Sequence, residues 1–465
     1  MMNRTPKSLS LLLIALVCLS ALPLLARAEA TDEEVKGILQ QRIEYAKKSV
    51  GIVVGLVDEK GARVITFGKP SLDGKQPLDG NSVFEIGSAT KVFTATLLAD
   101  MVERGEVSLS DPISKYLPKT VKTPTRDGKE ITLLDLATQT SGLPRLPTNF
   151  APKDPGNPYA DYSVDQLYAF LSSYTLTRGI GEKYEYSNLG VGLLGHILSL
   201  RAGTDYEALV RKRICQPLKM EDTSITLTPG MKTRLTTGHN PMLKPVANWD
   251  LPTLAGAGAL RSTVNDMLKF VAANVGLTKS PLLAAMQRAQ QSQRETGQAD
   301  LTIGLNWHIL KKFDSEIIWH NGGTGGYHSF IGFDKKNRKG VVVLSNSAND
   351  IDDIGRHLLV SQYPIAKVEP AKEHKAIQLD PKFLDAYAGE YQLAPGFSVV
   401  FTREGGKLFM QPTGQGKTEI IPESETDFFV AVADVQVTFV KDDQGQVSQA
   451  VLHQNGRNLP AKKIK

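Results

Sequence analysis

The stretch FEIGSATKVF, residues 84–93, sets a serine and a lysine three residues apart at the start of an apolar segment. Apolar residues continue at helical spacing as far as Val102, and Gly105 follows as a stop signal, so the stretch predicts the first turns of a buried helix. Residues three apart share one face of a helix, which brings the Ser88 hydroxyl beside the Lys91 amine. Serine is a weak nucleophile without such a base, so the spacing indicates nucleophilic catalysis.

A second interpretation of this stretch is a core helix with Ser88 as its N-terminal cap and Lys91 in solvent. About two chance Ser-x-x-Lys matches are expected in a chain of this length and ordinary composition. The segment alone therefore leaves both interpretations open.

The N-terminus, residues 1–28, is typical of a secretory signal peptide. Two cations precede an apolar run at residues 9–25, and Ala-Arg-Ala follows at 26–28. Ser20 and Pro23 interrupt the run, which makes it too short for a membrane anchor. We therefore expect export to the periplasm or the medium.

Composition excludes several classes of protein. Cys215 is the only cysteine left after cleavage, so an internal disulfide is excluded. The leader carries three cations and no acid, so its removal lowers the net charge from +5 to +2, which argues against a nucleic-acid partner. The eight histidines form no His-Glu-x-x-His motif, so we expect no metal and no other cofactor.

The order of expected elements predicts an α+β fold. Residues 50–68 read as a β-hairpin, residues 109–290 as helices and polar loops, and residues 301–344 as further strands. Strands at both ends around a helical middle predict one antiparallel sheet beside an all-helical region. We assign this domain to residues 29–365.

A different pattern begins after the proline-containing and charged stretch at residues 362–380. Short alternating segments are separated by turn signals such as those at residues 414–416 and 455–456. This spacing predicts a small all-β, barrel-like domain over residues 376–465.

Two further motifs follow the Ser-x-x-Lys pair in the chain. Tyr-Ser-Asn at residues 186–188 lies directly before an apolar helix, and His-Asn-Gly-Gly at residues 320–323 ends an expected strand. Together the three motifs resemble those of the serine β-lactamase and penicillin-binding-protein superfamily, within it the class C β-lactamases and D-alanyl-D-alanine carboxypeptidases. The resemblance runs over about residues 35–360. One departure is Gln139, where such proteins usually have histidine.

The resemblance implies a role for each catalytic residue. Ser88 attacks a carbonyl and carries the acyl group, which water or another acceptor then releases. Either Lys91 or a phenolate of Tyr186 takes the serine proton, and the sequence leaves this choice open. Asn188 either binds the substrate amide or holds Lys91 in place.

The third motif is implied to bind the substrate. The N–H groups of Ser88 and Gly323 are expected to form the oxyanion hole. Gly322 and Gly323 lack side chains, which lets the strand approach the substrate closely. His320 replaces the lysine of class C enzymes, and with a pKa near 6.5 it is expected to gain charge, and to hold carboxylates better, toward pH 6.

These features predict an exported serine hydrolase acting on β-lactams or on D-alanyl-D-alanine-type peptides. The alternatives are a carboxylic esterase on the same fold and a penicillin-binding or penicillin-sensing protein that acylates without turnover. The C-terminal domain resembles the lipocalin-like domain of some of these hydrolases. We interpret it as a lid or as an oligomerisation module that forms a homo-oligomer, with a ligand-binding barrel as the alternative.

Overall fold

The computed structural model describes residues 30–370, 374–394, 397–413, 416–431, 433, 435–454 and 457–465. The expected signal peptide lies outside these residues, as do the expected turn positions at 414–415 and 455–456. Within the described residues, no helix is both long and apolar enough to cross a membrane.

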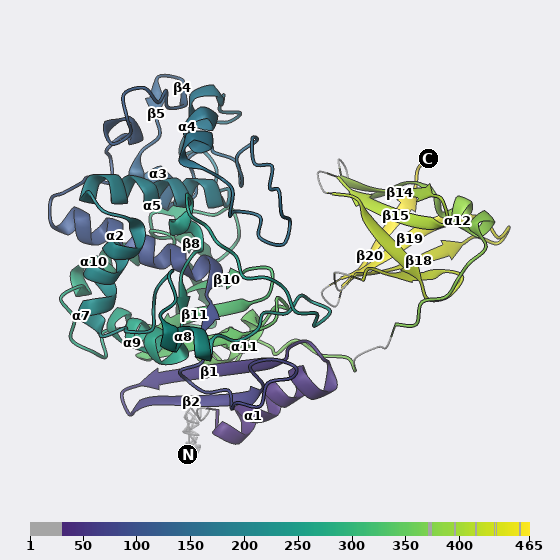
Figure 1. Ribbon diagram of the computed structural model, residues 1–465, viewed down its shortest axis with the longest axis horizontal. Helices are drawn as coiled ribbons and strands as arrows, with labels where there is room; N and C mark the ends of the chain where they lie inside the picture. Colours follow the sequence, from purple (N-terminus) through teal and green to yellow (C-terminus); the bar gives the residue numbers. More distant parts are fainter. Residues whose placement is uncertain are drawn as a thin grey trace, which may run out of the picture.

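A single antiparallel sheet of eight strands forms the centre of the larger domain, and its strands come from both ends of the domain (Figure 1). The N-terminal hairpin pairs with the last strand, so that Ile52 lies opposite Ser345. This confirms the sheet expected from the sequence. In spatial order the strands are β2 Gly61–Gly68, β1 Gly51–Asp58, β12 Lys339–Ser345, β11 His328–Asp334, β10 Ser315–Gly323, β9 His308–Lys312, β8 Leu301–Ile303 and β7 Arg294–Glu295.

Both faces of the central strands are buried, and their side chains alternate between two cores. In β1, Ile52 and Val54 pack with α1 and α11, whereas Val53 and Val57 point into the larger, helical core. This alternation follows from the period of two in a strand. It explains why β1 is a continuous run of apolar residues rather than a polar and apolar alternation.

Helices cover the sheet on both sides (Figure 1). Helix α9 packs on β1 and β12 from the helical side, while α1 and α11 cover the other face. The helices of this domain are α1 Asp32–Gln40, α2 Thr90–Glu103, α3 Leu133–Ala137, α4 Val164–Ser173, α5 Asn188–Ala202, α6 Tyr206–Val210, α7 Gln216–Leu218, α8 Pro229–Arg234, α9 Val264–Asn274, α10 Leu283–Ala289 and α11 Asp352–Leu359. Two small strand pairs complete it, β3 Phe84–Glu85 with β6 Arg261–Ser262 and β4 Thr125–Arg126 with β5 Lys129–Glu130.

The C-terminal region is a closed barrel of eight antiparallel strands, as the sequence predicted. Aromatic rings fill its interior: Phe439 stacks on Tyr387 of helix α12 (Pro381–Tyr387) at 4.5 Å and meets Tyr391, Phe401 and Phe428 edge to face. The strands are β13 Gly389–Ala394, β14 Phe397–Glu404, β15 Lys407–Pro412, β16 Thr418–Pro422, β17 Asp427–Phe429, β18 Val435–Lys441, β19 Val447–Gln454 and β20 Arg457–Lys463.

The barrel has a hydrophobic core of its own, made of residues from Leu379 onward, whereas the two cores of the larger domain end at Tyr363. The chain returns to contact with the barrel at His374, which stacks on Phe429 at 4.6 Å and lies 2.8 Å from Glu423. The connecting segment therefore lies between Tyr363 and His374.

Candidate active site

The serine lies in a short 3-10 turn, Gly87–Ala89, that runs directly into α2. Ser88 is partly exposed, whereas every residue from Thr90 to Met101 is buried. Ala89 occupies the N-cap position of α2, and the cap makes no side-chain hydrogen bond. Ser88 is therefore not the helix cap of the alternative interpretation, and its hydroxyl is left for other partners.

Lys91 is fully buried and makes three polar contacts from Nζ. These are with Ser88 Oγ at 2.9 Å, Asn188 Oδ1 at 2.9 Å and the Ala257 carbonyl at 2.7 Å. Burial lowers the pKa of Lys91 well below 10.5, and the nearby Arg145 guanidinium lowers it further. The interpretation of Lys91 as a solvated surface lysine is therefore wrong.

Asn188 is the first residue of α5, and the preceding Ser187 caps the helix by accepting a hydrogen bond from Gly190 N at 2.8 Å. The cap leaves the Asn188 side chain available for the site. Its Oδ1 accepts from Lys91, and its Nδ2 donates to the Tyr159 hydroxyl at 3.0 Å. In the free protein Asn188 therefore holds Lys91, one of the two roles expected for it.

Tyr186 completes this group of side chains. Its ring centroid lies 4.8 Å from Lys91 Nζ and 5.1 Å from Cζ of the exposed Arg145. Burial raises the pKa of Tyr186 above 10, although a hydrogen bond with Ser88 and the charge of Arg145 act in the opposite direction. The phenol is therefore neutral near pH 7, even with two basic side chains over its ring.

The third motif forms the end of β10, beside the nucleophile turn. Strand β9 pairs with β10 only as far as Trp319, whereas β11 continues to Gly323. Within the part of the chain that the structure describes, residues 320–323 therefore have no strand neighbour on the β9 side. This leaves a free main-chain edge in the site.

The two glycines of the motif differ in their surroundings. A Cβ on Gly322 would lie 2.8 Å from Ser88 N and 2.6 Å from Ser329 Oγ, and it would also meet the Ile86 carbonyl. On Gly323 the nearest atom would be 3.9 Å away. The bare Gly322 therefore lets β10 approach the nucleophile turn closely, a contact that the sequence did not predict. Gly323 is exposed and faces open space.

His320 is 1% exposed, and its ring contacts Tyr186 at 6.3 Å and His308 at 5.1 Å between centroids. Burial, reinforced by His308 and Lys91, lowers the pKa of His320 well below 6.5. Burial and Lys91 likewise lower the pKa of His308 to about 4. His320 therefore stays neutral at pH 6, which contradicts the expectation that it gains charge there.

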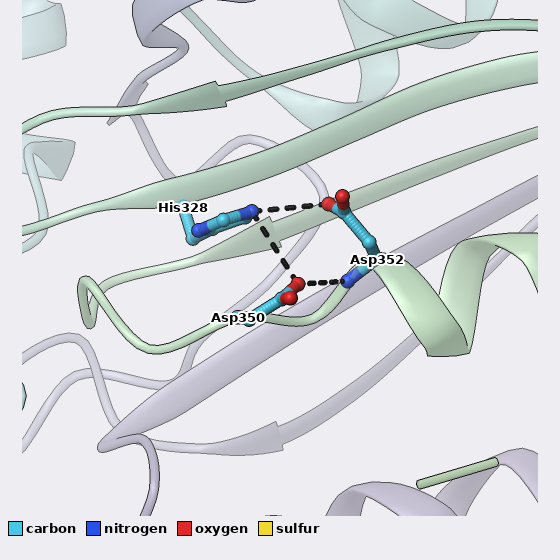
Figure 2. Close-up of side chains that lie close together, drawn as sticks. All are labelled: His328, Asp350 and Asp352. Atoms are coloured by element: carbon cyan, nitrogen blue, oxygen red, sulfur yellow. Dashed lines mark hydrogen bonds and ion pairs between the residues drawn. The ribbon is translucent and has the colours of Figure 1, made fainter. Parts of the chain in front are cut away.

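A charged cluster lies beside the third motif (Figure 2). It consists of His328, which pairs with Gly323 across β10 and β11, and of Asp350 and Asp352, just before and at the start of α11. His328 Nε2 is 3.0 Å from Asp352 Oδ1 and 3.7 Å from Asp350 Oδ1, and Asp352 Oδ2 accepts from Asn321 Nδ2 at 2.7 Å. These residue types also bind metal ions. Burial lowers the pKa of His328, but the hydrogen bond and charge of Asp352 outweigh it and raise the pKa overall. The two carboxylates therefore favour the protonated imidazole, and in that form the cluster is an ion pair that ties β10, β11 and α11 together.

The structure also adds residues that the motifs do not contain. The Ala257 carbonyl is a main-chain atom and has no sequence signature. Tyr159 lies on a loop, and Arg145 follows the Thr-Ser-Gly-Leu-Pro stretch at residues 140–144. Gln139, noted only as a departure, accepts a hydrogen bond from Ser187 N at 2.8 Å and so contacts the second motif.

A serine at a helix start, a buried lysine of lowered pKa and a tyrosine from another element, set beside a free strand edge, define a serine hydrolase of the acyl-enzyme type. The chain belongs to the beta-lactamase family, whose profile matches residues 35–361. A second match, to a domain of unknown function called DUF3471, covers residues 373–463.

Relatives of this chain span peptidases and β-lactamases. The chain is 31% identical over 362 residues to the D-alanyl-D-alanine-carboxypeptidase/endopeptidase AmpH of Escherichia coli K12, covering 73% of this chain and 91% of the relative. It is 26% identical to penicillin-binding protein 4* of Bacillus subtilis, covering 86% and 92%. It also resembles the crystal structure of a beta-lactamase/D-alanine carboxypeptidase from Yersinia pestis, with a TM-score of 0.62, 27% identity, and coverage of 72% and 99%.

Proposed function

We propose that the protein is an exported enzyme in which Ser88 forms an acyl-enzyme with β-lactams or with D-alanyl-D-alanine-type peptides, and water then releases the product. The observation that carries the proposal is the position of Lys91 Nζ between Ser88 Oγ and two carbonyl oxygens. The relatives named above act on these classes of substrate according to their names.

Lys91 is the proposed proton acceptor. In its neutral form the amine has two N–H groups and one lone pair. The carbonyls of Asn188 and Ala257 take the two N–H groups, which turns the lone pair toward the Ser88 hydroxyl. The lowered pKa of Lys91 favours this neutral form near pH 7. Lys91 can therefore accept the serine proton as Ser88 attacks the carbonyl carbon.

Tyr186 is the proposed donor to the leaving group rather than the first base. Its raised pKa disfavours the phenolate, but a neutral hydroxyl hydrogen-bonded with Ser88 can pass a proton on. Once Lys91 has become an ammonium, it returns a proton to the phenolate that Tyr186 leaves behind. In this scheme the serine proton reaches the departing amine through Lys91 and Tyr186.

The substrate would lie along the free edge of β10. A peptide or acylamide backbone can hydrogen-bond to residues 320–323 on the side that β9 leaves uncovered, as a strand added to a sheet edge does. The N–H groups of Ser88 and Gly323 are the proposed oxyanion donors. Neutral His320 cannot hold a carboxylate by charge, so we assign that role to Arg145, the exposed cation above Tyr186.

A carboxylic esterase is the second candidate, because the third motif supplies a neutral histidine rather than a cation. Incubation with a penicillin, a D-alanyl-D-alanine peptide and a short-chain ester, followed by intact mass measurement, separates the candidates. We expect a mass gain at Ser88 and turnover of the peptide or the β-lactam, and none in Ser88→Ala. Turnover of the ester alone would favour the esterase, and a stable adduct without turnover would favour a penicillin sensor. No adduct with any compound would overturn the proposal.

Export and domain limits are part of the proposal. We infer that residues 1–28 are removed, that residues 29–365 form the hydrolase domain, and that residues 376–465 belong to the barrel. The contact of His374 with Glu423 favours a barrel domain that includes the last residues of the connecting segment. The N-terminal sequence of the protein secreted by a bacterial host would test the cleavage site.

A further inference from the structure

Gln139 is a buried residue two positions after α3, with 2% exposure and a left-handed backbone, φ 61°. Its carbonyl accepts a hydrogen bond from Glu185 N at 2.8 Å, and its side-chain Oε1 accepts one from Ser187 N at 2.8 Å. These are the N–H groups of the residues on either side of Tyr186. One residue therefore holds the backbone on both sides of the proposed catalytic phenol.

The other end of the Gln139 carboxamide reaches a different element. Its Nε2 donates to Asn306 Oδ1 at 2.9 Å, and Asn306, which is fully buried, donates its own N–H to the Ala137 carbonyl at 2.7 Å. Asn306 lies between β8 and β9, two residues before His308. His308 in turn contacts His320. The carboxamide thus links the loop of the second motif to the segment that leads into β9, the strand beside β10.

We propose that Gln139 is a positioning residue that sets the place of the Tyr186 hydroxyl beside Ser88 and Lys91. An amide N–H needs an oxygen acceptor, so Ser187 determines which way the carboxamide points, and Nε2 is left to donate to Asn306. The carboxamide does not titrate, so this link keeps its hydrogen bonds at every pH at which the protein is folded. The inference rests on the proposed role of Tyr186 in acyl transfer.

Gln139→Leu removes both side-chain hydrogen bonds and serves as the test variant. Gln290→Leu is the matched control, because Gln290 is 3% exposed and also loses two hydrogen bonds, to Asn274 O and Oδ1, without contact with the motifs. A misplacement of about 1 Å can cost about a hundredfold in rate. We therefore expect acylation of folded Gln139→Leu to fall tenfold to a hundredfold below that of Gln290→Leu at a similar loss of thermal stability.

The double variant Gln139→Leu/Tyr186→Phe shows whether the effect passes through the phenol. Groups that act as a unit are not additive, so we expect the Gln139 substitution to add less than about threefold in the Tyr186→Phe background. Equal acylation in Gln139→Leu and Gln290→Leu, or a full multiplicative loss in the double variant, would overturn the inference.

Gln139→His is the second variant, in case the leucine variant does not fold. A neutral imidazole can accept from Ser187 N and donate to Asn306, but a protonated one cannot accept. Acylation should be close to that of the unaltered protein at pH 8 and should fall more steeply below pH 6. A profile parallel to that of the unaltered protein would contradict the inference.

Amide hydrogen exchange of the segment 184–188 tests the positioning without any substrate. Exchange should be faster in Gln139→Leu than in the unaltered protein and in Gln290→Leu. If the unaltered protein forms no adduct with any probe, the proposed function fails, while faster exchange in Gln139→Leu would still show that Gln139 positions the Tyr186 loop. Unchanged exchange in Gln139→Leu would overturn this positioning role whatever the activity.

Discussion

Gly322→Ala is expected to separate the nucleophile turn from β10. The added Cβ would lie 2.8 Å from Ser88 N, about 0.6 Å inside the 3.4 Å at which ordinary contacts begin, and nearer still to the Ile86 carbonyl. Both atoms are main chain, so no side-chain rotation can relieve the overlap. The strand or the turn must therefore move by more than half an ångström.

The movement acts on the atom that forms the proposed acyl bond. Because a misplacement of about 1 Å can cost about a hundredfold, we expect the acylation rate of Gly322→Ala to fall by at least tenfold and up to about a hundredfold. Overpacking of this kind also costs about 1–3 kcal/mol of stability. The assay is the rate at which Ser88 gains mass from a small fluorophosphonate, measured on protein with an intact near-ultraviolet circular dichroism spectrum.

Gly323→Ala is the matched control, because its Cβ would meet no atom closer than the Tyr327 carbonyl oxygen at 3.9 Å. Its reaction with the small probe should stay within about threefold of that of the unaltered protein, while larger substrates that use the free edge lose more. Equal rates in the two folded variants would refute the account of β10 and the nucleophile turn.

Three further predictions concern other parts of the molecule. Arg145→Ala should raise the pKa of Lys91, which burial and then Arg145 lower, so the acidic limb of the acylation pH profile should move to higher pH. In the same variant, kcat/KM for a carboxylate substrate should fall about tenfold to a hundredfold relative to that for its methyl ester. An unmoved limb and equal losses for the two substrates would contradict both roles of Arg145. The raised pKa of His328 implies a stabilisation that is complete below about pH 6.5 and is lost as pH rises through the pKa of the folded state. The Tm of the hydrolase domain should therefore fall between pH 6 and pH 9 in the unaltered protein, and should fall less in His328→Gln. An equal pH dependence of Tm in the two proteins would exclude the ion pair as its cause. Phe439→Ala removes the ring at the centre of the barrel and should destabilise the barrel by about 3–5 kcal/mol in denaturant unfolding, without changing the rate of acylation of Ser88. A parallel loss of acylation would show that the barrel supports the site.

Much of the fold was predictable because its signals are local. The hairpin of β1 and β2 and the succession of barrel turns follow from short patterns, and the Ser88 and Lys91 pair follows from the geometry of one helical turn. The order of the three motifs then pointed to a shared site. What these signals have in common is that each is contained within a few consecutive residues.

The electrostatics of the site could not be read in this way. The pKa of His320 depends on His308, which becomes its neighbour only because β9 and β10 pair with Trp319 opposite His308. The Lys91 pKa depends on complete burial, and one of its acceptors is a main-chain carbonyl. Gln139 was recognisable as unusual, but its partners at Ser187 and Asn306 come from separate elements. Tertiary contacts therefore decided the charge states that the motifs left open.

The pairing of β1 with β12 has a consequence for how the chain folds. A sheet that joins Ile52 to Ser345 cannot close until nearly the whole hydrolase domain has been synthesised, and such distant pairings fold slowly. Until then β1 exposes apolar side chains on both faces, as an early intermediate prone to aggregation would. The barrel is the opposite case: seven of its eight strand pairings join consecutive strands, so it can form rapidly once its own residues are available. The part of the chain made last is thus able to reach its native state before the part made first.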